Sequence, residues 1–385
     1  MPWKETDPMK EKIKLISAYE EGYGITELSR AFEVSRKTIY KIIRRYEKEG
    51  VDGLKEYSRK PHSNPYTTSP DIVEEIIALK KKHRNWGPVK LISRLKKIMP
   101  GVKWPSASTA GNWLKKNNLV KPRRKRMKVP SYNEAFAECV EPNDIWSIDY
   151  KGEFKTKDGL YCYPLTISDN VSRYLLSCKG MYGTRHDESK KELERVFREY
   201  GIPYVIRSDN GVPFASASIT GLSRLSVWWI KLGIFPERIA KGKPQQNGRH
   251  ERMHRTLKDE ISDRIAKDLV SQQRDFEVFR EEYNTIRPHA SLGNKSPRDV
   301  YVKSNRRYPQ TLGIVDYEYG DIVRSVRSSG EVKFRGELYY LSSLLRGERV
   351  CFKEEEDGIF TIYFSFYPIA RFNMCKKKIE SLEGK

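Results

Sequence analysis

The 385-residue sequence has few cysteines and no long apolar run. Its five cysteines are dispersed and include no Cys-x-x-Cys pair: Cys139, Cys162, Cys178, Cys351 and Cys375. This spacing excludes a disulfide framework and favours a reducing compartment, which we expect to be the cytoplasm. The first residues lack the apolar core of a secretory signal, and no stretch reaches the length of a membrane span. We therefore expect no membrane partner.

Histidine is also scarce, with six residues spread along the chain. Neither histidine nor cysteine forms a cluster with metal-ligand spacing, so we expect no zinc site. No Gly-rich loop has the pattern of a phosphate-binding loop, so no nucleotide cofactor is expected. Acidic residues are outnumbered, with 51 Asp and Glu against 73 Lys and Arg, which gives a formal net charge of +22. This excess favours a nucleic acid partner, with general solubility as the alternative.

The segment 25–49 has the pattern of a helix-turn-helix. A first helix buries Leu28, a three-residue turn follows, and Ser35 caps a second helix with an apolar stripe. The other faces of the second helix carry the residues that we predict to contact DNA: Arg36, Lys37, Tyr40, Lys41, Arg44 and Arg45. We expect this helix to enter the major groove, although a helical hairpin with a solvated basic face is the alternative. An earlier helix is expected to bury Ile13, Ile16 and Tyr19 on one face.

A second helical unit follows a Pro/Ser/Asn-rich connector. Three helical patterns, over about 71–83, 88–101 and 106–119, predict a second helix-turn-helix, winged or plain. A basic run comes next and contains four further predicted DNA contacts: Arg123, Arg124, Lys125 and Arg126. Such a run is either a solvated linker or a neutraliser of phosphates that adds affinity without sequence information.

From Asn143 the pattern changes to a mixed α/β layout. Three short β-rich runs precede a helix over 186–201 and a strand over 204–208, and further helices are predicted over 223–233 and 247–269. From about Asp316 to Phe372 the runs are again β-like and predict a small all-β domain, a barrel or a sandwich, of which we expect the barrel. We therefore predict a multidomain α/β protein with domains at 1–60, 61–128, 129–305 and 306–385.

Three acidic residues sit where these elements end or turn. Asp149 lies near the end of the first strand, Asp209 follows the strand 204–208, and Glu251 lies on the helix that begins near residue 248. Each has a simpler explanation when taken singly. Asp149 would fit a strand edge, Asp209 would fit a turn in which Asn210-Gly211 favours positive φ, and Glu251 would fit an ion pair with Arg255.

Taken together, the three carboxylates suit phosphodiester chemistry. Breaking or joining a phosphodiester requires an activated oxygen nucleophile and a stabilised leaving oxygen, and two Mg²⁺ ions about 4 Å apart can supply both. Mg²⁺ is a hard cation that takes oxygen ligands, so Asp and Glu are suitable residue types. No Cys or His cluster is apparent as a rival metal site.

The motifs around these residues resemble those of the bacterial insertion-sequence DDE transposases, whose core is similar to retroviral integrases. The matching stretches are WSIDYK around Asp149, SDNGVPF around Asp209 and PQQNGRHERMHRTLK around Glu251. Tyr283-Asn284 and Arg287-Pro288-His289 follow in the same order as in the family. Together these motifs span residues 145–297.

The resemblance implies an RNase H-like core and Mg²⁺-dependent DNA strand cleavage and strand transfer. It implies that Asp149, Asp209 and Glu251 are catalytic and coordinate two Mg²⁺ ions, with Mn²⁺ able to substitute. It also suggests that Lys258 contacts DNA near the active site, where Arg255 adds a second basic group on the same helix face. The 42 positions between Asp209 and Glu251 exceed the family's usual spacing, and the excess falls within 213–229.

The implied partners are double-stranded DNA, as element ends and as target, and further copies of the chain on paired ends. A DNA transposase that binds the terminal inverted repeats of its element, in the bacterial cytoplasm or nucleoid, is therefore the leading hypothesis. Two alternatives stay open: a nonenzymatic sequence-specific DNA-binding regulator, and a nuclease that cleaves without joining.

Overall fold

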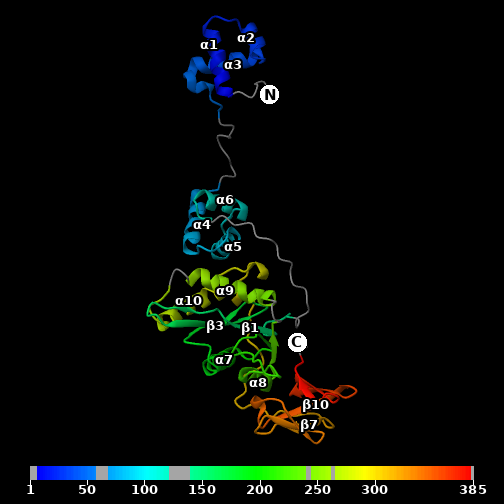
Figure 1. Cartoon of the computed structure of the whole chain (residues 1–385). Coiled ribbons are helices and arrows are strands. Elements are labelled where there is room, and N and C mark those ends of the chain that lie inside the picture. Colours follow the sequence, from blue (N-terminus) through cyan, green and yellow to red (C-terminus); the bar gives the residue numbers. More distant parts are fainter. Residues whose placement is uncertain (1–6, 58–67, 121–138, 240–243, 262–264, 383–385) are drawn as a thin grey trace. The chain divides into compact units, whose positions relative to one another are not determined.

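The computed structural model describes residues 7–57, 68–120, 139–239, 244–261 and 265–382 (Figure 1). Contacts divide the chain into two compact units, Met1–Thr67 and Thr68–Lys385. The predicted DNA contacts Arg123, Arg124, Lys125 and Arg126 lie outside the described residues. Across the described segments, no helix is long and apolar enough to cross a membrane.

The first unit is a three-helix module. It consists of α1 (Pro8–Glu20), α2 (Ile25–Ala31), α3 (Arg36–Glu49) and a short 3-10 helix, η1 (Gly50–Leu54). The Ser35 hydroxyl accepts a hydrogen bond from the Thr38 backbone N–H, so the predicted cap is confirmed. The expected apolar face of α1 is partly wrong, because Ile13 and Tyr19 are exposed. Ile16 is buried as predicted, and Leu15 is buried in addition, so the inward face is centred on Leu15 and Ile16.

The second unit begins with another three-helix module, made of α4 (Pro70–Lys82), α5 (Pro88–Ile98) and α6 (Ala107–Lys116). Its core contains Ile76, Leu91, Leu95 and Leu114, together with the buried Trp86. The helices lie where the pattern predicts them, since apolar residues recur at helical spacing and each start carries Pro or Ser at the first positions.

The central sheet has six strands in the described residues. They are β1 (Ile145–Tyr150), β2 (Phe154–Lys155), β3 (Tyr161–Asp169), β4 (Leu175–Met181), β5 (Val205–Ser208) and β6 (Phe235–Arg238). The order is β2-β3-β1-β5-β6, with β4 paired to β3. β1, β3 and β4 pair antiparallel, whereas β5 lies parallel to β1 and to β6. Strand β6 has no counterpart in the predicted elements, because a four-residue run containing Pro236 has a weak strand signal.

Helices cover both faces of this sheet. On one face lie α7 (His186–Tyr200) and α8 (Arg224–Lys231), and on the other lie α9 (Gly248–Ile261) and α10 (Leu269–Thr285) (Figure 1). The single helix predicted over 247–269 is wrong, since α9 ends at Ile261. Asp268 caps a new helix by accepting a hydrogen bond from the Ser271 N–H at 2.7 Å.

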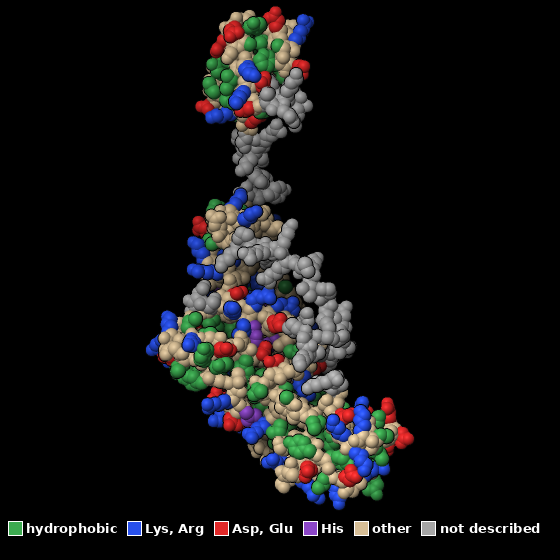
Figure 2. Space-filling view, in the orientation of Figure 1, with side chains coloured by type: hydrophobic (Ala, Val, Ile, Leu, Met, Phe, Trp, Pro, Cys, Tyr) green, Lys and Arg blue, Asp and Glu red, His purple; other side chains and the backbone are tan. Residues whose placement is uncertain are grey.

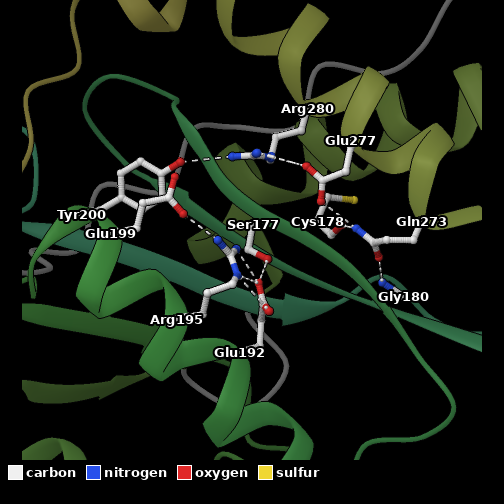
Figure 3. A network of polar contacts seen from close by, with 10 residues as sticks. All are labelled: Ser177, Cys178, Gly180, Glu192, Arg195, Glu199, Tyr200, Gln273, Glu277 and Arg280. Atoms are coloured by element: carbon white, nitrogen blue, oxygen red, sulfur yellow. Dashed lines mark hydrogen bonds and ion pairs between the residues drawn. The ribbon is translucent and has the colours of Figure 1, made fainter. Parts of the chain in front are cut away.

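The outer edge of β4 is covered by α10, as Figure 3 shows for part of the contact. The Gln273 side chain accepts from Gly180 N–H at 2.9 Å and donates to the Cys178 carbonyl at 3.1 Å. The Asn284 side chain likewise accepts from the Leu175 N–H at 2.8 Å and donates to the Leu175 carbonyl at 3.0 Å. These amides satisfy backbone groups that an exposed edge strand would present to other chains.

The C-terminal region is an open antiparallel sheet. Its strands are β7 (Ile322–Ser325), β8 (Glu331–Phe334), β9 (Glu337–Tyr340), β10 (Arg349–Glu356), β11 (Ile359–Phe364), β12 (Tyr367–Asn373) and β13 (Lys378–Glu380). Five of them form one sheet in the order β13-β12-β11-β10-β7. β8 and β9 form a second, two-stranded sheet, and Val332 of β8 also forms an isolated bridge with Val326. The predicted β-rich domain is present, but a closed barrel is not confirmed. Phe334 stacks on Phe352 at 4.2 Å between ring centroids and fills the core between the two sheets.

Candidate active site

Two of the predicted acidic residues come from neighbouring parallel strands. In the β1–β5 pair, Ser147 lies opposite Arg207. Two residues further along the chain in each case are Asp149, which is still on β1, and Asp209, which directly follows the end of β5. The carboxyl ends of parallel neighbours meet at one edge of a sheet, where ligand sites form in α/β proteins. The pairing therefore brings Asp149 and Asp209 to the same edge.

The loop after β5 holds the Asp209 carboxylate close to the backbone. Its Oδ1 accepts the Gly211 N–H at 3.1 Å, and the Asn210 side chain donates to the Ile239 carbonyl at 2.6 Å. The expected positive φ is wrong, because neither Asn210 nor Gly211 has one. A Cβ at Gly211 would instead lie 2.9 Å from Asp209 Oδ2, so a larger residue there would displace the end of the Asp209 side chain.

The third acidic residue, Glu251, lies in the first turn of α9 and is exposed. Its neighbours His250 and His254 are buried and contact Thr166 on β3. Thr166 lies directly opposite Asp149 in the β1–β3 register. The contacts of His250 and His254 with Thr166 therefore hold the first turns of α9 against the β1–β3 pair, which carries Asp149.

Electrostatics also link the three carboxylates. The pKa of Asp149 is raised to about 7, first by burial and then by the negative charge of Asp209, with a further contribution from Glu251. Lys151 and the Tyr150 backbone N–H act in the opposite direction. The site thus concentrates negative charge in a partly buried position, an arrangement that a bound cation would relieve.

Sequence reasoning missed a histidine cluster at this site. Ligand atoms of Asp149, His250 and His254 lie within 4.8 Å of one another, whereas Asp209 and Glu251 are outside this group. The expectation that no histidine cluster exists is therefore wrong. Burial lowers the pKa of His250 to about 3 and that of His254 to about 2, so both rings are neutral. The available signal was their spacing of four residues on one helix, which places both rings on the same face.

The predicted DNA contacts of the described residues are mostly exposed. On α3 they are Arg36, Lys37, Tyr40, Lys41 and Arg44. Arg45 is half-buried and stacks over the Tyr57 ring at 4.0 Å, so its side chain is held against its own module. Arg255 and Lys258 are exposed on α9, one and two helical turns after Glu251. Figure 2 shows Lys and Arg side chains beside acidic and histidine side chains on the visible face of the core.

The remaining motif residues serve the packing of α10. Asn284 caps the edge of β4, and Tyr283 packs edge-to-face on His289 at 4.9 Å. Arg287 forms an ion pair with Glu260 on α9 at 3.0 Å. This motif therefore joins α9, α10 and the sheet, and supports the helix that carries Glu251.

Family models match most parts of the chain. Integrase core domain models match residues 140–244 and 232–297. A helix-turn-helix domain model matches 11–62, and a homeodomain-like domain model matches 38–114. Residues 321–380 match the IS481 family transposase C-terminal domain.

Individual relatives point the same way. The chain is 28% identical over 185 residues to an insertion element IS407 uncharacterized 31.7 kDa protein of Burkholderia multivorans, covering 48% of this chain and 64% of that protein. It is 24% identical over 258 residues to an insertion element IS476 uncharacterized 39.2 kDa protein of Xanthomonas euvesicatoria, covering 66% of this chain and 71% of that protein. Among solved structures, the HTLV-2 integrase catalytic core domain in complex with magnesium matches 43% of this chain and 100% of its own, at 16% identity and a TM-score of 0.35.

An integrase-type mixed α/β core combined with helix-turn-helix domains defines the class of this protein. The chain has the domain make-up of an integrase-family transposase of insertion elements. The resemblance to bacterial insertion-sequence DDE transposases is thereby confirmed.

Proposed function

We propose that this protein binds the terminal inverted repeats of its element and catalyses metal-dependent DNA strand cleavage and strand transfer. The observation that carries the proposal is the convergence of Asp149 and Asp209 on one sheet edge, with the charge of Glu251 acting on Asp149. The activity places the protein with DNA in the bacterial cytoplasm. We expect a homo-oligomer on paired ends, because each end requires its own catalytic core.

In this proposal Asp149, Asp209 and Glu251 hold two Mg²⁺ ions, for which Mn²⁺ can substitute. The donor set fits, because all three residues offer hard oxygen ligands and the Gly211 N–H holds Asp209 Oδ1 at 3.1 Å. The ions would supply nucleophile activation and leaving-oxygen stabilisation. The protein's own part is to hold the carboxylates on two strands and a helix that are fixed to one sheet.

DNA recognition is divided in the proposal between the helical modules and the core. The exposed side chains of α3, including Arg36, Lys37 and Lys41, would reach base edges and phosphates in the major groove. Arg255 and Lys258 would contact DNA beside the active site. The basic run 123–126 would add phosphate contacts without sequence preference.

The chemistry is tested by comparing the wild type with Asp209→Asn on a duplex that carries the element's own end. We expect cleavage and joining by the wild type with Mg²⁺ and neither product from Asp209→Asn. Strand transfer by Asp209→Asn at the wild-type rate, or wild-type products in EDTA, would refute the metal-dependent mechanism. Cleavage without joined product would instead favour the nuclease.

Recognition is tested separately by a chain that begins at Tyr66. This chain lacks the first helix-turn-helix but keeps the complete second unit. We expect it to lose preference for the element's end over an unrelated duplex of equal length, in a gel-shift competition. Retained preference would show that the first module does not read the sequence. End binding without any cleavage by the full chain would favour the DNA-binding regulator.

A further inference from the structure

A single buried hydroxyl joins the strand of Asp149 to the helix of Glu251. Thr166 Oγ1 lies 3.0 Å from the Asp149 backbone carbonyl oxygen. The same oxygen lies 2.8 Å from His250 Nε2 and 2.7 Å from His254 Nε2. Thr166 is fully buried, so these contacts are shielded from water.

The contacts of Thr166 determine which nitrogen of each histidine carries hydrogen. A hydroxyl has one hydrogen to donate, and a carbonyl oxygen can only accept. The bond to the Asp149 carbonyl therefore uses the Thr166 hydrogen, and both Nε2 atoms must donate to Oγ1. An imidazole binds a cation only in its neutral form, which has one N–H, so with Nε2 donating each Nδ1 carries a lone pair and no hydrogen.

The two histidines differ at Nδ1. In His250 this nitrogen accepts the Ser168 hydroxyl at 2.8 Å, so both ring nitrogens are used. In His254 the described residues provide no hydrogen bond to Nδ1, and Asp149 Oδ2 lies 3.8 Å from it, which is too long for one. The lone pair of His254 thus faces the carboxylate of Asp149, and the two side chains are only 8% and 21% exposed.

Two electron-rich atoms facing each other across 3.8 Å fit a shared cation. Metal–ligand bonds of about 2.1 Å allow two ligand atoms of one ion to lie up to roughly 4.2 Å apart. Without a cation, the His254 lone pair faces a carboxylate oxygen in a partly buried position, which is unfavourable unless Asp149 takes up a proton.

We propose that His254 Nδ1 is a further ligand of the cation held by Asp149, and that Thr166 is the positioning residue that orients it. This inference rests on the proposed function of the site. A nitrogen donor favours later first-row transition metals over Mg²⁺, whereas Mn²⁺ takes the same oxygen ligands as Mg²⁺ and serves here as the probe. His250, which has no free ring nitrogen, holds α9 to β3 and is not a ligand.

The test uses the full chain with Mn²⁺ as the probe and pulsed electron paramagnetic resonance as the readout. A directly bound imidazole gives a ¹⁴N hyperfine coupling that oxygen ligands do not give. We expect the coupling in the wild type and in His186→Gln, a control histidine on α7. In His254→Gln we expect Mn²⁺ still to bind, with affinity reduced on the order of tenfold, and the coupling to be lost.

Thr166 provides a matched pair of variants. Thr166→Ser keeps the hydroxyl, so we expect the ¹⁴N coupling to persist. Thr166→Val keeps the shape but removes the hydroxyl, so we expect a weaker or absent coupling and Mn²⁺ affinity roughly 10-fold lower. If a variant does not fold, ¹⁵N-histidine labelling of the wild type shows whether the coupled nitrogen belongs to a histidine. A coupling that does not change with the isotope would overturn the proposal.

Two failures are distinguishable. Mn²⁺ that binds the wild type and is lost in Asp149→Asn, but shows no ¹⁴N coupling, would overturn the role of His254 and leave the carboxylate site intact. Unchanged coupling in a folded His254→Gln variant would overturn it as well. No Mn²⁺ binding that depends on Asp149 would contradict the proposed function and this inference together.

Discussion

The two faces of the central sheet are built from different chemistry. Towards α7 and α8 the sheet presents Trp146, Ile148 and Ile167, which pack on Phe197 and Trp229. Towards α9 the alternate positions of β1 and β3 are polar: Ser147, Asp149, Thr166 and Ser168. Because side chains alternate along a strand, a single pair of strands serves both faces.

The difference shows how rigidity and reactivity are combined in the core. The apolar face holds the strands by burial of large side chains, which requires no defined hydrogen-bond geometry. On the polar face, Met253 and Leu257 of α9 pack in a small apolar cluster. Beside this cluster, hydrogen bonds from Thr166 and Ser168 to the two histidines fix distances at the site. Variants on the two faces should therefore have separable effects on activity and on stability.

The largest effect is expected on the polar face, for Glu251→Gln. If Glu251 is a metal ligand as proposed, loss of its charge should reduce strand cleavage on the order of 10³-fold, because metal stabilisation of the transition state is worth several kcal/mol. The exposed Glu251 makes little packing contact, so the unfolding midpoint should stay at the wild-type value. Glu194→Gln on α7 is the matched control and should keep full activity. Equal loss in both variants would contradict the separation of the faces.

On the apolar face, Phe197→Ala should lower the stability of the protein and leave the activity of the folded molecules unchanged. Phe197 is fully buried among Trp146 and Trp228, and its truncation should lower the free energy of unfolding by about 3–5 kcal/mol. Urea unfolding followed by tryptophan fluorescence measures this change. The fraction that remains folded should still cleave DNA at the wild-type rate. A cleavage defect in folded protein would mean that the apolar face also sets the site geometry.

Gly211→Ala tests whether activity depends on the position of the Asp209 carboxylate, because the substitution adds one methyl group and no charge. The new Cβ would lie 2.9 Å from Asp209 Oδ2, so the carboxylate must shift. We expect cleavage to fall roughly 10- to 100-fold, as for other displaced ligand contacts, with stability nearly unchanged. Gly183→Ala is the control, since a Cβ there meets no atom within 4 Å. Full activity of Gly211→Ala would show that Asp209 tolerates displacement.

The smallest effect is expected on the pH dependence of stability. It is measured at His83, a buried histidine outside the central sheet. His83 stacks on Trp86 at 4.1 Å, and its pKa is lowered to about 4, mainly by burial. The unfolded chain binds this proton near pH 6.5, so stability falls as pH drops from about 6.5 towards 4. The loss at pH 5 should be up to about 2 kcal/mol.

Thermal unfolding of the wild type and His83→Gln at pH 7.5 and pH 5 measures this contribution. The variant should lose less stability on acidification than the wild type. The acid sensitivity that remains in the variant then reports on other groups, including the histidines of the polar face. An identical pH dependence of the two proteins would contradict the burial of a neutral His83.

Much of this arrangement was predictable from local sequence patterns. Strands β1 and β3, helix α7 and the helices of both N-terminal modules follow from periodicity and capping residues. Strand β6 was missed because its four residues are placed by pairing with β5 and not by their own pattern. The open C-terminal sheet likewise depends on pairings between distant strands that composition does not specify.

The site was predictable only in part. The motifs selected Asp149, Asp209 and Glu251 as candidates, and those assignments stay predictions. The role of His254 depends on Thr166, which lies 88 residues away in sequence, so spacing within α9 could not indicate it. Gly211 appeared to be a turn residue, because close approach of a neighbouring carboxylate leaves no local signature.

Divalent metal binding tests the central claim most directly. Isothermal titration of the full chain with Mn²⁺ should show binding in the wild type that is lost in Asp149→Asn, while a matched surface variant, Asp187→Asn, should bind as the wild type does. The same Asp149→Asn protein should retain binding to the element's end. Undiminished Mn²⁺ binding by Asp149→Asn would contradict the assignment of a metal site to the sheet edge.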